Sequence, residues 1–298
     1  MIDSKDKIIE YFSSGIKEPK SFKIGIEHEK FLFNNKDNKR VDYSKIKEMF
    51  QALQEFGWKP VFEKKNIIGL NKGGKNITLE PGNQIELSGD KLNHMHEACA
   101  ESQDYLFELK QVTKKLDIKI VSSGFDPFSK LDEIPNNPKE RYKLMTKSMP
   151  LGGELSLDMM YRTCGTQLNI DYKSEDDFKK KFLITNSIVP ITIALFANSS
   201  IVEKKNSNYL SYRSKVWQST SRGGLPKLFF ENLNFEKYAD FVMEFPILFI
   251  KHENKYISGS NYTFGDFMNG KINEIGNRLP NENDLTTHLS TIFTENRL

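Results

Sequence analysis

Pairs of glutamates occur in short segments in which apolar and polar residues alternate. In IGIEHEKFLF, Glu27 and Glu29 are two residues apart, so a β-strand would place both carboxylates on one face. Their Cα atoms would lie about 7 Å apart, where two unit charges repel by roughly 2.4 kcal/mol at an effective dielectric of about 20. A bound cation would offset that repulsion. Taken alone, the pair is better explained as a solvated strand face screened by nearby lysines.

A second segment, ITLEPGNQIELSG, adds two more acids. Glu80 precedes a Pro-Gly turn signal, and Gln84 and Glu86 share one face of the strand that follows. Mg²⁺ prefers hard oxygen ligands and is usually held by a few carboxylates together with substrate phosphates. Glutamates on a rigid sheet suit that task. Taken singly, Glu80 also fits an ordinary turn acid and Glu86 an exposed strand residue.

The segment RTCGTQLNID carries a polar face that includes Gln167 and Asn169. Their amides could bind a metal or a substrate as neutral ligands, although hydrogen bonding across a sheet is the commoner role for such side chains. Arg162 begins the segment, and the alternation does not decide which way it points. It could reach a substrate from the strand end or pair with a surface acid.

Two other arginines are candidates for binding an anion. Arg141 lies in ERYKLM and Arg213 in LSYRSKVWQ, and a guanidinium can hold a carboxylate or phosphate through two parallel hydrogen bonds. Each is also explained as a surface residue, and Trp217 as core packing. The pattern GxxxxGK[ST] is absent from the sequence, so a nucleotide would have to bind outside a P-loop fold.

The elements that position these residues follow from the periodicity of the apolar residues. The spacing predicts helices at 42–57, 94–116 and 175–198, the first ending at Gly57 and the third kinked at Pro190. Extended segments are predicted at 22–33, 60–70, 76–80, 84–88, 118–125 and 162–171. This mixture predicts an α+β protein with a largely antiparallel sheet flanked by helices. We expect residues 1–298 to form a single catalytic domain.

Composition excludes several classes of protein. The 43 Lys and Arg residues against 40 Asp and Glu give a net charge of +3, which argues against nucleic acid as a partner. The longest apolar stretch, at 191–196, is far shorter than the roughly 20 residues of a membrane-spanning helix. The N-terminus has no secretory leader, which predicts a cytoplasmic protein. Cys99 and Cys164 are the only cysteines, so disulfide scaffolds and zinc sites are poorly supported.

Together these segments resemble the plant and proteobacterial type of glutamate-cysteine ligase, whose fold is related to that of glutamine synthetase. The resemblance covers IGIEHEKF, ITLEPGNQIELSG, HEACAE, PKERYKLM, MPLGGELSLDMMYRTCGTQLNID, PITIALFANSS, LSYRSKVW, GGLP, FGDFMNGK and HLSTIFTENRL. So many segments in family order make the resemblance specific. Two departures stand out. Gly165 replaces the hydroxyl residue that follows the family's RTC motif, and the family continues past Leu298 into a strand with a further metal-ligand Glu and a phosphate-binding Arg.

The resemblance implies ligation in two steps, the first step of glutathione biosynthesis. ATP phosphorylates the γ-carboxylate of glutamate, and the amino group of cysteine then displaces phosphate. Mg²⁺ would be held by four carboxylates and by nucleotide phosphates, near two amides. Arg162 and Arg213 would be the catalytic residues and would hold the substrate carboxylate, and Arg141 and Trp217 would also bind the substrate. The implied metal ligands are Glu27, Glu29, Glu80 and Glu86, and the implied cofactor-binding amides are Gln167 and Asn169. We expect a monomer or homodimer.

Two alternatives remain open at this stage. A related glutamate ligase could join a different amine, because no motif identifies the acceptor pocket. The second alternative is a noncatalytic remnant that binds glutamate or nucleotide, because the family's C-terminal part is not in the sequence.

Overall fold

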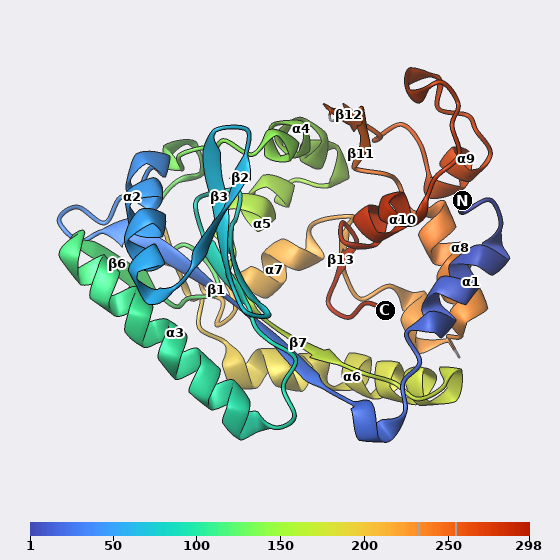
Figure 1. Ribbon diagram of the computed structural model, residues 1–298, viewed down its shortest axis with the longest axis horizontal. Helices are drawn as coiled ribbons and strands as arrows, with labels where there is room; N and C mark the ends of the chain where they lie inside the picture. The colour runs from blue at the N-terminus through green and yellow to red at the C-terminus, as the bar shows by residue number, and fades with distance from the viewer. Residues whose placement is uncertain (232, 254) are drawn as a thin grey trace.

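The computed structural model describes residues 1–231, 233–253 and 255–298 (Figure 1). Its strands are β1 Ile24–Asn34, β2 Lys59–Glu63, β3 Asn66–Lys72, β4 Lys75–Leu79, β5 Ile85–Ser88, β6 Ile118–Val121, β7 Thr166–Ile170, β8 Ile201–Val202, β9 Lys205–Asn206, β10 Gly223–Gly224, β11 Phe249–His252, β12 Lys255–Ser258 and β13 Phe293–Thr294. Its α-helices are α1 Lys5–Ser14, α2 Tyr43–Leu53, α3 Met95–Lys115, α4 Glu140–Ser148, α5 Ser156–Arg162, α6 Glu175–Phe196, α7 Tyr212–Gln218, α8 Phe235–Glu244, α9 Phe264–Met268 and α10 Glu282–Leu289.

A seven-stranded sheet carries the acidic segments. Its strand order is β2-β3-β4-β5-β1-β6, and β7 also pairs with β1. The central strand β1 pairs with β5 along one edge, and with β7 and then β6 along the other. All pairings in this sheet are antiparallel. The predicted α+β class, with a mostly antiparallel sheet flanked by helices, is therefore confirmed.

Three of the predicted extended segments differ from the observed strands. The segment 60–70 is a hairpin of β2 and β3, because the chain reverses at Lys64, which has a left-handed φ of 56°. The segment 118–125 stays in the sheet only as far as Val121. The segment 162–171 joins the sheet only at Thr166, because Arg162 is the last residue of helix α5.

Helices α2 and α3 cover the side of the sheet that faces away from the acids. Helix α2 buries Ile46, Met49, Phe50 and Leu53 at helical spacing against apolar residues of β3, β4 and β5. A short 3₁₀ turn extends it to Phe56 before Gly57, whose φ of 88° stops the helix as predicted. Helix α3 matches the predicted helix 94–116, and Figure 1 shows both helices on the same side of the molecule.

A second core forms where the two ends of the chain meet. It joins α1, α8, α9, α10 and the first half of α6 around an aromatic group that includes Phe12, Phe178, Phe182, Phe229 and Tyr238. Figure 1 shows α1 next to α8, with both termini on this side. This core anchors the C-terminal segment beside the large sheet.

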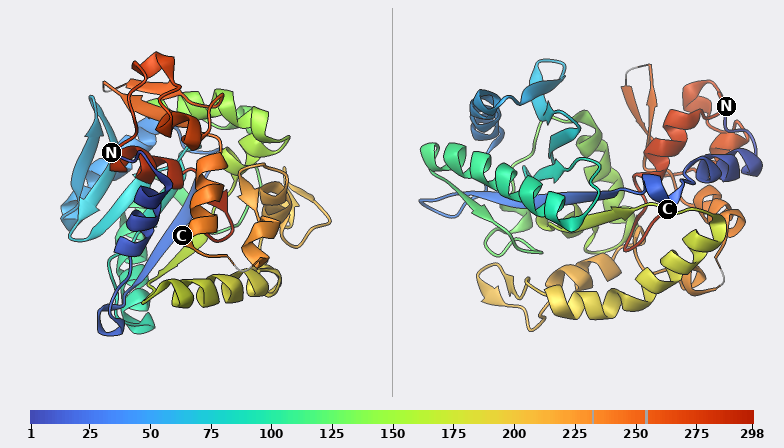
Figure 2. Two further views of the ribbon diagram at one scale, coloured as in Figure 1. Left: turned by 90° about the vertical axis from the view of Figure 1, so that its right-hand side faces the viewer. Right: turned by 60° about the horizontal axis from the view of Figure 1, so that its bottom comes forward.

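The second half of α6 is covered by little of the described chain. The helix continues through Pro190 to Phe196 and is curved along its length (Figure 2). Its large exposed apolar side chains, together with two on β7, are Leu183, Ile184, Ile188, Ile191, Leu195, Phe196, Leu168 and Ile170. Strand β7 pairs only with β1 among the described strands. None of the helices in the described ranges has the length and apolarity to cross a membrane.

Candidate active site

The acidic face of the large sheet is one wall of a pocket with a volume of about 420 Å³. Residues of α4, α5 and α7 and of the chain end around β13 supply much of the remaining lining, together with Phe249 of β11. Most of the predicted site residues line it: Glu27, Glu29, Glu80, Glu86, Gln167, Arg141, Arg213 and Trp217. Segments from both ends of the chain therefore meet at one cavity.

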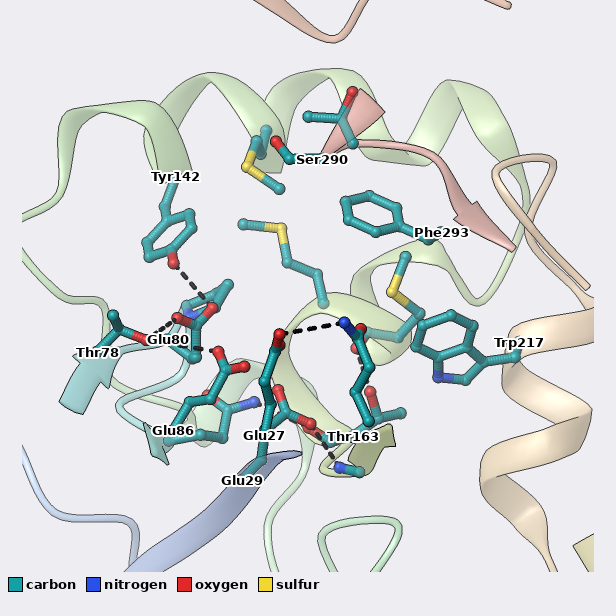
Figure 3. A pocket seen from close by; sticks show the side chains of 18 of the residues that line it. Glu27, Glu29, Thr78, Glu80, Glu86, Tyr142, Thr163, Trp217, Ser290 and Phe293 are labelled. Carbon is teal, nitrogen blue, oxygen red and sulfur yellow. Dashed lines mark hydrogen bonds between the residues drawn. The ribbon is translucent and has the colours of Figure 1, made fainter. Parts of the chain in front are cut away.

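Strand register explains how the four glutamates come together. Glu29 lies opposite Glu86 on β5, and Glu86 lies opposite Thr78 on β4, so these three residues form a row across the sheet. Glu27 shares the face of β1 with Glu29 because their positions differ by two. Figure 3 shows Glu27, Glu80 and Glu86 pointing toward one another, with Glu29 beside them.

Two hydroxyl groups hold Glu80 at the hairpin turn between β4 and β5. Tyr142 Oη donates to one carboxylate oxygen of Glu80 at 3.0 Å, and Thr78 Oγ1 donates to the other at 3.0 Å (Figure 3). The same Thr78 hydroxyl lies 3.4 Å from Glu86 Oε2. The turn itself closes through backbone bonds between Glu80 and Gln84 at 2.8 Å and between Asn83 and Glu80 at 2.9 Å. The carboxylate of Glu80 is thus fixed in direction.

Crowding raises the pKa of two of these acids. Burial, followed by the nearby charge of Glu80, raises the pKa of Glu86 to about 10. The same two causes raise the pKa of Glu29 to about 7, although Arg213 and the backbone N–H of Gly165 favour its charged form. In the absence of a cation this wall therefore holds protons at neutral pH.

The donor set suits a hard divalent cation. The described ranges contain no group of three or more His, Cys, Asp or Glu side chains already arranged as a metal site. Mg²⁺ does not require a complete protein cage, because it keeps several waters and takes substrate phosphates as ligands. Oxygen atoms from four glutamates, two of them holding protons that a cation could replace, fit that pattern.

The two predicted amides surround Glu27. Gln167 Nε2 and Asn169 Nδ2 donate to Glu27 Oε1 at 3.2 Å and 3.0 Å, and Gln167 also donates to Asn169 Oδ1. Only Gln167 lines the pocket. Its carbonyl oxygen accepts from Arg297 Nη2 at 2.7 Å. These amides therefore fix the direction of the Glu27 carboxylate, and Asn169 does so from outside the cavity.

The helices that line the pocket carry three hydrogen-bond donors without partners among the described residues. Arg213 lies with its guanidinium carbon 4.5 Å from the centre of the Trp217 ring, and Arg141 lies 4.9 Å from that of Tyr142. Arg141 Nε, Arg213 Nε and Trp217 Nε1 are buried and have no hydrogen-bond partner among the described residues. Buried polar groups are normally satisfied, so unpaired donors in a pocket indicate an anionic or strongly polar ligand.

Arg162 is not brought together with the other candidates. Its guanidinium pairs with Asp158 at 2.8 Å and with Glu203 at 3.3 Å, and its carbon lies 4.6 Å from the centre of the Phe125 ring. It does not line the pocket. The physical reason is local. Because 156–162 is helical, Arg162 is separated from the alternating face of β7.

Several lining residues were not identified from the sequence. They include Thr78, Tyr142, Met145, Met149, Met159, Met160, Phe249, Ser290, Thr291, Phe293, Thr294 and Arg297. Thr78 could have been found, since it lies two residues before Glu80 on the same strand face. Tyr142 adjoins Arg141 in a segment already singled out. The methionines and Phe249 carry no local signal, because apolar residues in helices and strands are typical of any core.

Comparisons with known proteins agree on one family. The family model described as Glutamate-cysteine ligase family 2 (GCS2) matches residues 23–298. Over 299 aligned residues and 99% of this chain, the identity is 42% to glutamate--cysteine ligase, chloroplastic, of Nicotiana tabacum and 40% to its counterpart in Arabidopsis thaliana. Glutamate--cysteine ligase A, chloroplastic, of Oryza sativa subsp. japonica is also 40% identical.

Two further facts come from these relatives. The chain spans 57% of the Nicotiana and Arabidopsis proteins and 61% of the Oryza protein. All three are named as chloroplastic, which contradicts the cytoplasmic location expected from the N-terminus. That expectation was wrong because it considered only a secretory leader.

Proposed function

Because this chain belongs to glutamate-cysteine ligase family 2, we propose that its pocket serves the ATP-dependent joining of the γ-carboxylate of glutamate to the amino group of cysteine. One observation carries the proposal. Four carboxylates on the sheet, and three N–H donors on α4 and α7 that have no partner among the described residues, line one cavity of about 420 Å³. Such a pocket suits ligands that bring both a cation–phosphate group and a carboxylate.

The acidic wall would hold Mg²⁺. We assign Glu27, Glu29, Glu80 and Glu86 as its ligands, with Gln167 beside them. When bound, the ion neutralises nucleotide phosphates and the charge that develops as a phosphoryl group is transferred. Thr78 and Tyr142 orient Glu80 through their hydroxyl groups, and Gln167 and Asn169 orient Glu27 through their amides.

The helical wall of the pocket, formed by α4, α5 and α7, would bind the organic substrates. Arg213 and Arg141 can each donate two parallel hydrogen bonds to a carboxylate or phosphate. The guanidinium of Arg213 stacks on the ring of Trp217. Positioning the γ-carboxylate against the terminal phosphate lets it attack phosphorus and displace ADP. The amine then attacks the acyl carbon, loses a proton and releases phosphate. The four methionines that line this wall exclude water, which would otherwise hydrolyse the activated carboxylate.

The lining also supports one catalytic unit. It runs from Glu27 to Arg297 and draws on nearly the whole chain. We therefore propose that residues 1–298 act as a single domain.

A coupled ADP-release assay tests the proposal. We expect release that requires Mg²⁺, glutamate and cysteine, with γ-glutamylcysteine as the product identified by mass. Glu27→Gln should abolish release, whereas Glu48→Gln, at an exposed position on α2, should leave it unchanged. Release with another amine in place of cysteine would identify a different acceptor. Binding of glutamate and ATP without ADP release would contradict the proposed activity.

A further inference from the structure

A buried ion pair lies behind the pocket, at Arg40 and Asp126. Arg40 Nη1 donates to Asp126 Oδ2 at 3.1 Å, and neither side chain has exposed surface. The guanidinium carbon lies 4.7 Å from the centre of the Phe31 ring and 5.6 Å from that of Phe33, so aromatic faces surround it. Burying two charges is costly even when they are paired, and an apolar replacement is often as stable. Stability alone therefore does not explain this pair.

Arg40 also binds two backbone carbonyls, each next in the chain to a residue that lines the pocket, Pro81 or Met160. Its Nη2 donates to Gly82 O, and its Nη1 lies 3.4 Å from Tyr161 O. Gly82 belongs to the hairpin turn that carries Glu80, and Tyr161 lies in α5 shortly before β7. One planar guanidinium thus connects Asp126, the acidic hairpin and the end of α5.

The turn has little freedom once Arg40 is in place. Gln84 Nε2 donates to Tyr161 O at 3.0 Å, so the turn and Arg40 share that carbonyl. Asn83 Nδ2 donates to Val41 O at 3.0 Å, next to Arg40 in the chain. A Cβ on Gly82 would lie 2.7 Å from Tyr161 O, which shows how closely the two segments approach. A shift of Arg40 would therefore move the turn.

We propose that Arg40 is a positioning residue for the cation site. It holds the turn at Gly82 against the end of α5. Glu80 lies at one end of this turn, and Glu86 lies two residues beyond its other end. Holding the turn therefore fixes the positions of both carboxylates. A lysine could keep the charge, but its single ammonium group cannot bond Asp126, Gly82 and Tyr161 in the plane of a fork. This proposal rests on the proposed cation role of the acidic wall.

Arg40→Lys tests the proposal by metal binding. Mn²⁺, as a paramagnetic substitute for Mg²⁺, is titrated into the full chain without substrates, and free Mn²⁺ is counted by electron paramagnetic resonance. We expect the dissociation constant to rise roughly tenfold, the size of effect seen when groups that orient metal ligands are removed. The KM for Mg²⁺ in ADP release should rise in parallel, while the KM for glutamate changes less than about threefold.

Leu53→Ala is the matched control. Leu53 is fully buried in α2, on the far side of the sheet, so the substitution lowers the melting temperature without touching the turn. We expect it to leave Mn²⁺ binding unchanged. If Arg40→Lys lowers the melting temperature similarly and also leaves Mn²⁺ binding unchanged, the pair is only structural and the proposal is overturned.

Asp126→Asn keeps the test decisive if Arg40→Lys does not fold. The amide oxygen can still accept from the backbone N–H groups of Phe128 and Ser129, but Arg40 loses its counter-charge. We expect weaker Mn²⁺ binding here too, and unchanged binding would overturn the proposal. Failure of the wild-type chain to bind Mn²⁺ at all would instead contradict the proposed cation site.

Discussion

The two walls of the pocket are built in opposite ways. The sheet wall consists of carboxylates on adjacent strands, close enough to raise the pKa of Glu29 and Glu86. The helical wall combines methionines with arginine and tryptophan N–H groups that lack partners in the part of the chain that the structure describes. One wall has an excess of acceptors and the other an excess of donors. The difference teaches that the sheet wall crowds carboxylates together while the helical wall leaves N–H donors without partners among the described residues, so each is adapted to a different part of the ligands.

Glu86→Gln should give the largest effect, because it removes a central ligand of the acidic wall. We expect Mg²⁺-dependent ADP release to fall by roughly a hundredfold or more. The melting temperature of the metal-free protein should rise at neutral pH, because Glu86, with its raised pKa, must take up a proton on folding and a glutamine need not. Calorimetry measures the melting temperature, and the coupled assay measures ADP release. A variant that is less stable and fully active would show that the acidic wall binds no cation.

Arg213→Lys should affect only the donor wall. A lysine cannot reproduce the fork that would hold a carboxylate, which costs about 1.5–3 kcal/mol, or a roughly 10- to 150-fold loss in kcat/KM for glutamate. Mn²⁺ binding should be retained. Arg162→Lys is the informative comparison, because Arg162 is paired with Asp158 and Glu203 outside the pocket. Arg162→Lys should lower the melting temperature while kcat/KM for glutamate stays close to that of the wild type. Equal losses of activity in the two variants would contradict the division between the two walls.

The stability of the metal-free protein should depend on pH through the acidic wall. The pKa values of Glu29, about 7, and Glu86, about 10, lie above the roughly 4.3 of an unfolded glutamate. Between these values the folded protein binds more protons than the unfolded chain, so stability falls as pH rises. Melting temperatures should therefore decrease from about pH 5 to about pH 8, and Mg²⁺ should raise them more at the higher pH. Glu86→Gln should flatten this dependence, and a rise over the same range would contradict the assignment.

Gly165→Ala should give the smallest effect. A Cβ at this position would lie 3.1 Å from Arg213 Nη2, so the end of a flexible side chain must move slightly. We expect a cost below about 1 kcal/mol, seen as a roughly two- to fivefold higher KM for glutamate with Mn²⁺ binding unchanged. Steady-state kinetics measures it. A loss of Mn²⁺ binding would instead show that position 165 acts on Glu29, whose carboxylate accepts from the backbone N–H of Gly165.

The sheet wall could be predicted because strand geometry is regular. A spacing of two places Glu27 and Glu29 on one face whatever the rest of the fold, and a Pro-Gly turn brings Glu80 close to Glu86. The same rule failed for Arg162, because the predicted strand at 162–171 included residues that belong to helix α5 or precede β7. Helix boundaries depend on tertiary packing, which the local pattern does not contain.

The donor wall could be predicted only in part. Arg141, Arg213 and Trp217 were found through residue type and family resemblance. Met145, Met160 and Phe249 were not found, because their approach to the sheet depends on contacts between distant segments. Arg40 was missed for another reason. A single arginine in a segment rich in charged residues, KDNKRVD, is typical of a surface, and only the buried pair with Asp126 shows otherwise.

The uncovered side of α6 and β7 has a practical consequence. Isoleucines 184, 188 and 191 and Leu195 recur along one side of a helix next to a strand whose outer edge has no partner among the described strands. Surfaces of this kind promote aggregation as protein concentration rises, because apolar contact and strand pairing act together. Solubility of the chain should therefore be lowest in strongly salting-out buffers such as ammonium sulfate, which strengthen apolar association. Preparations for the binding and kinetic measurements are best kept dilute.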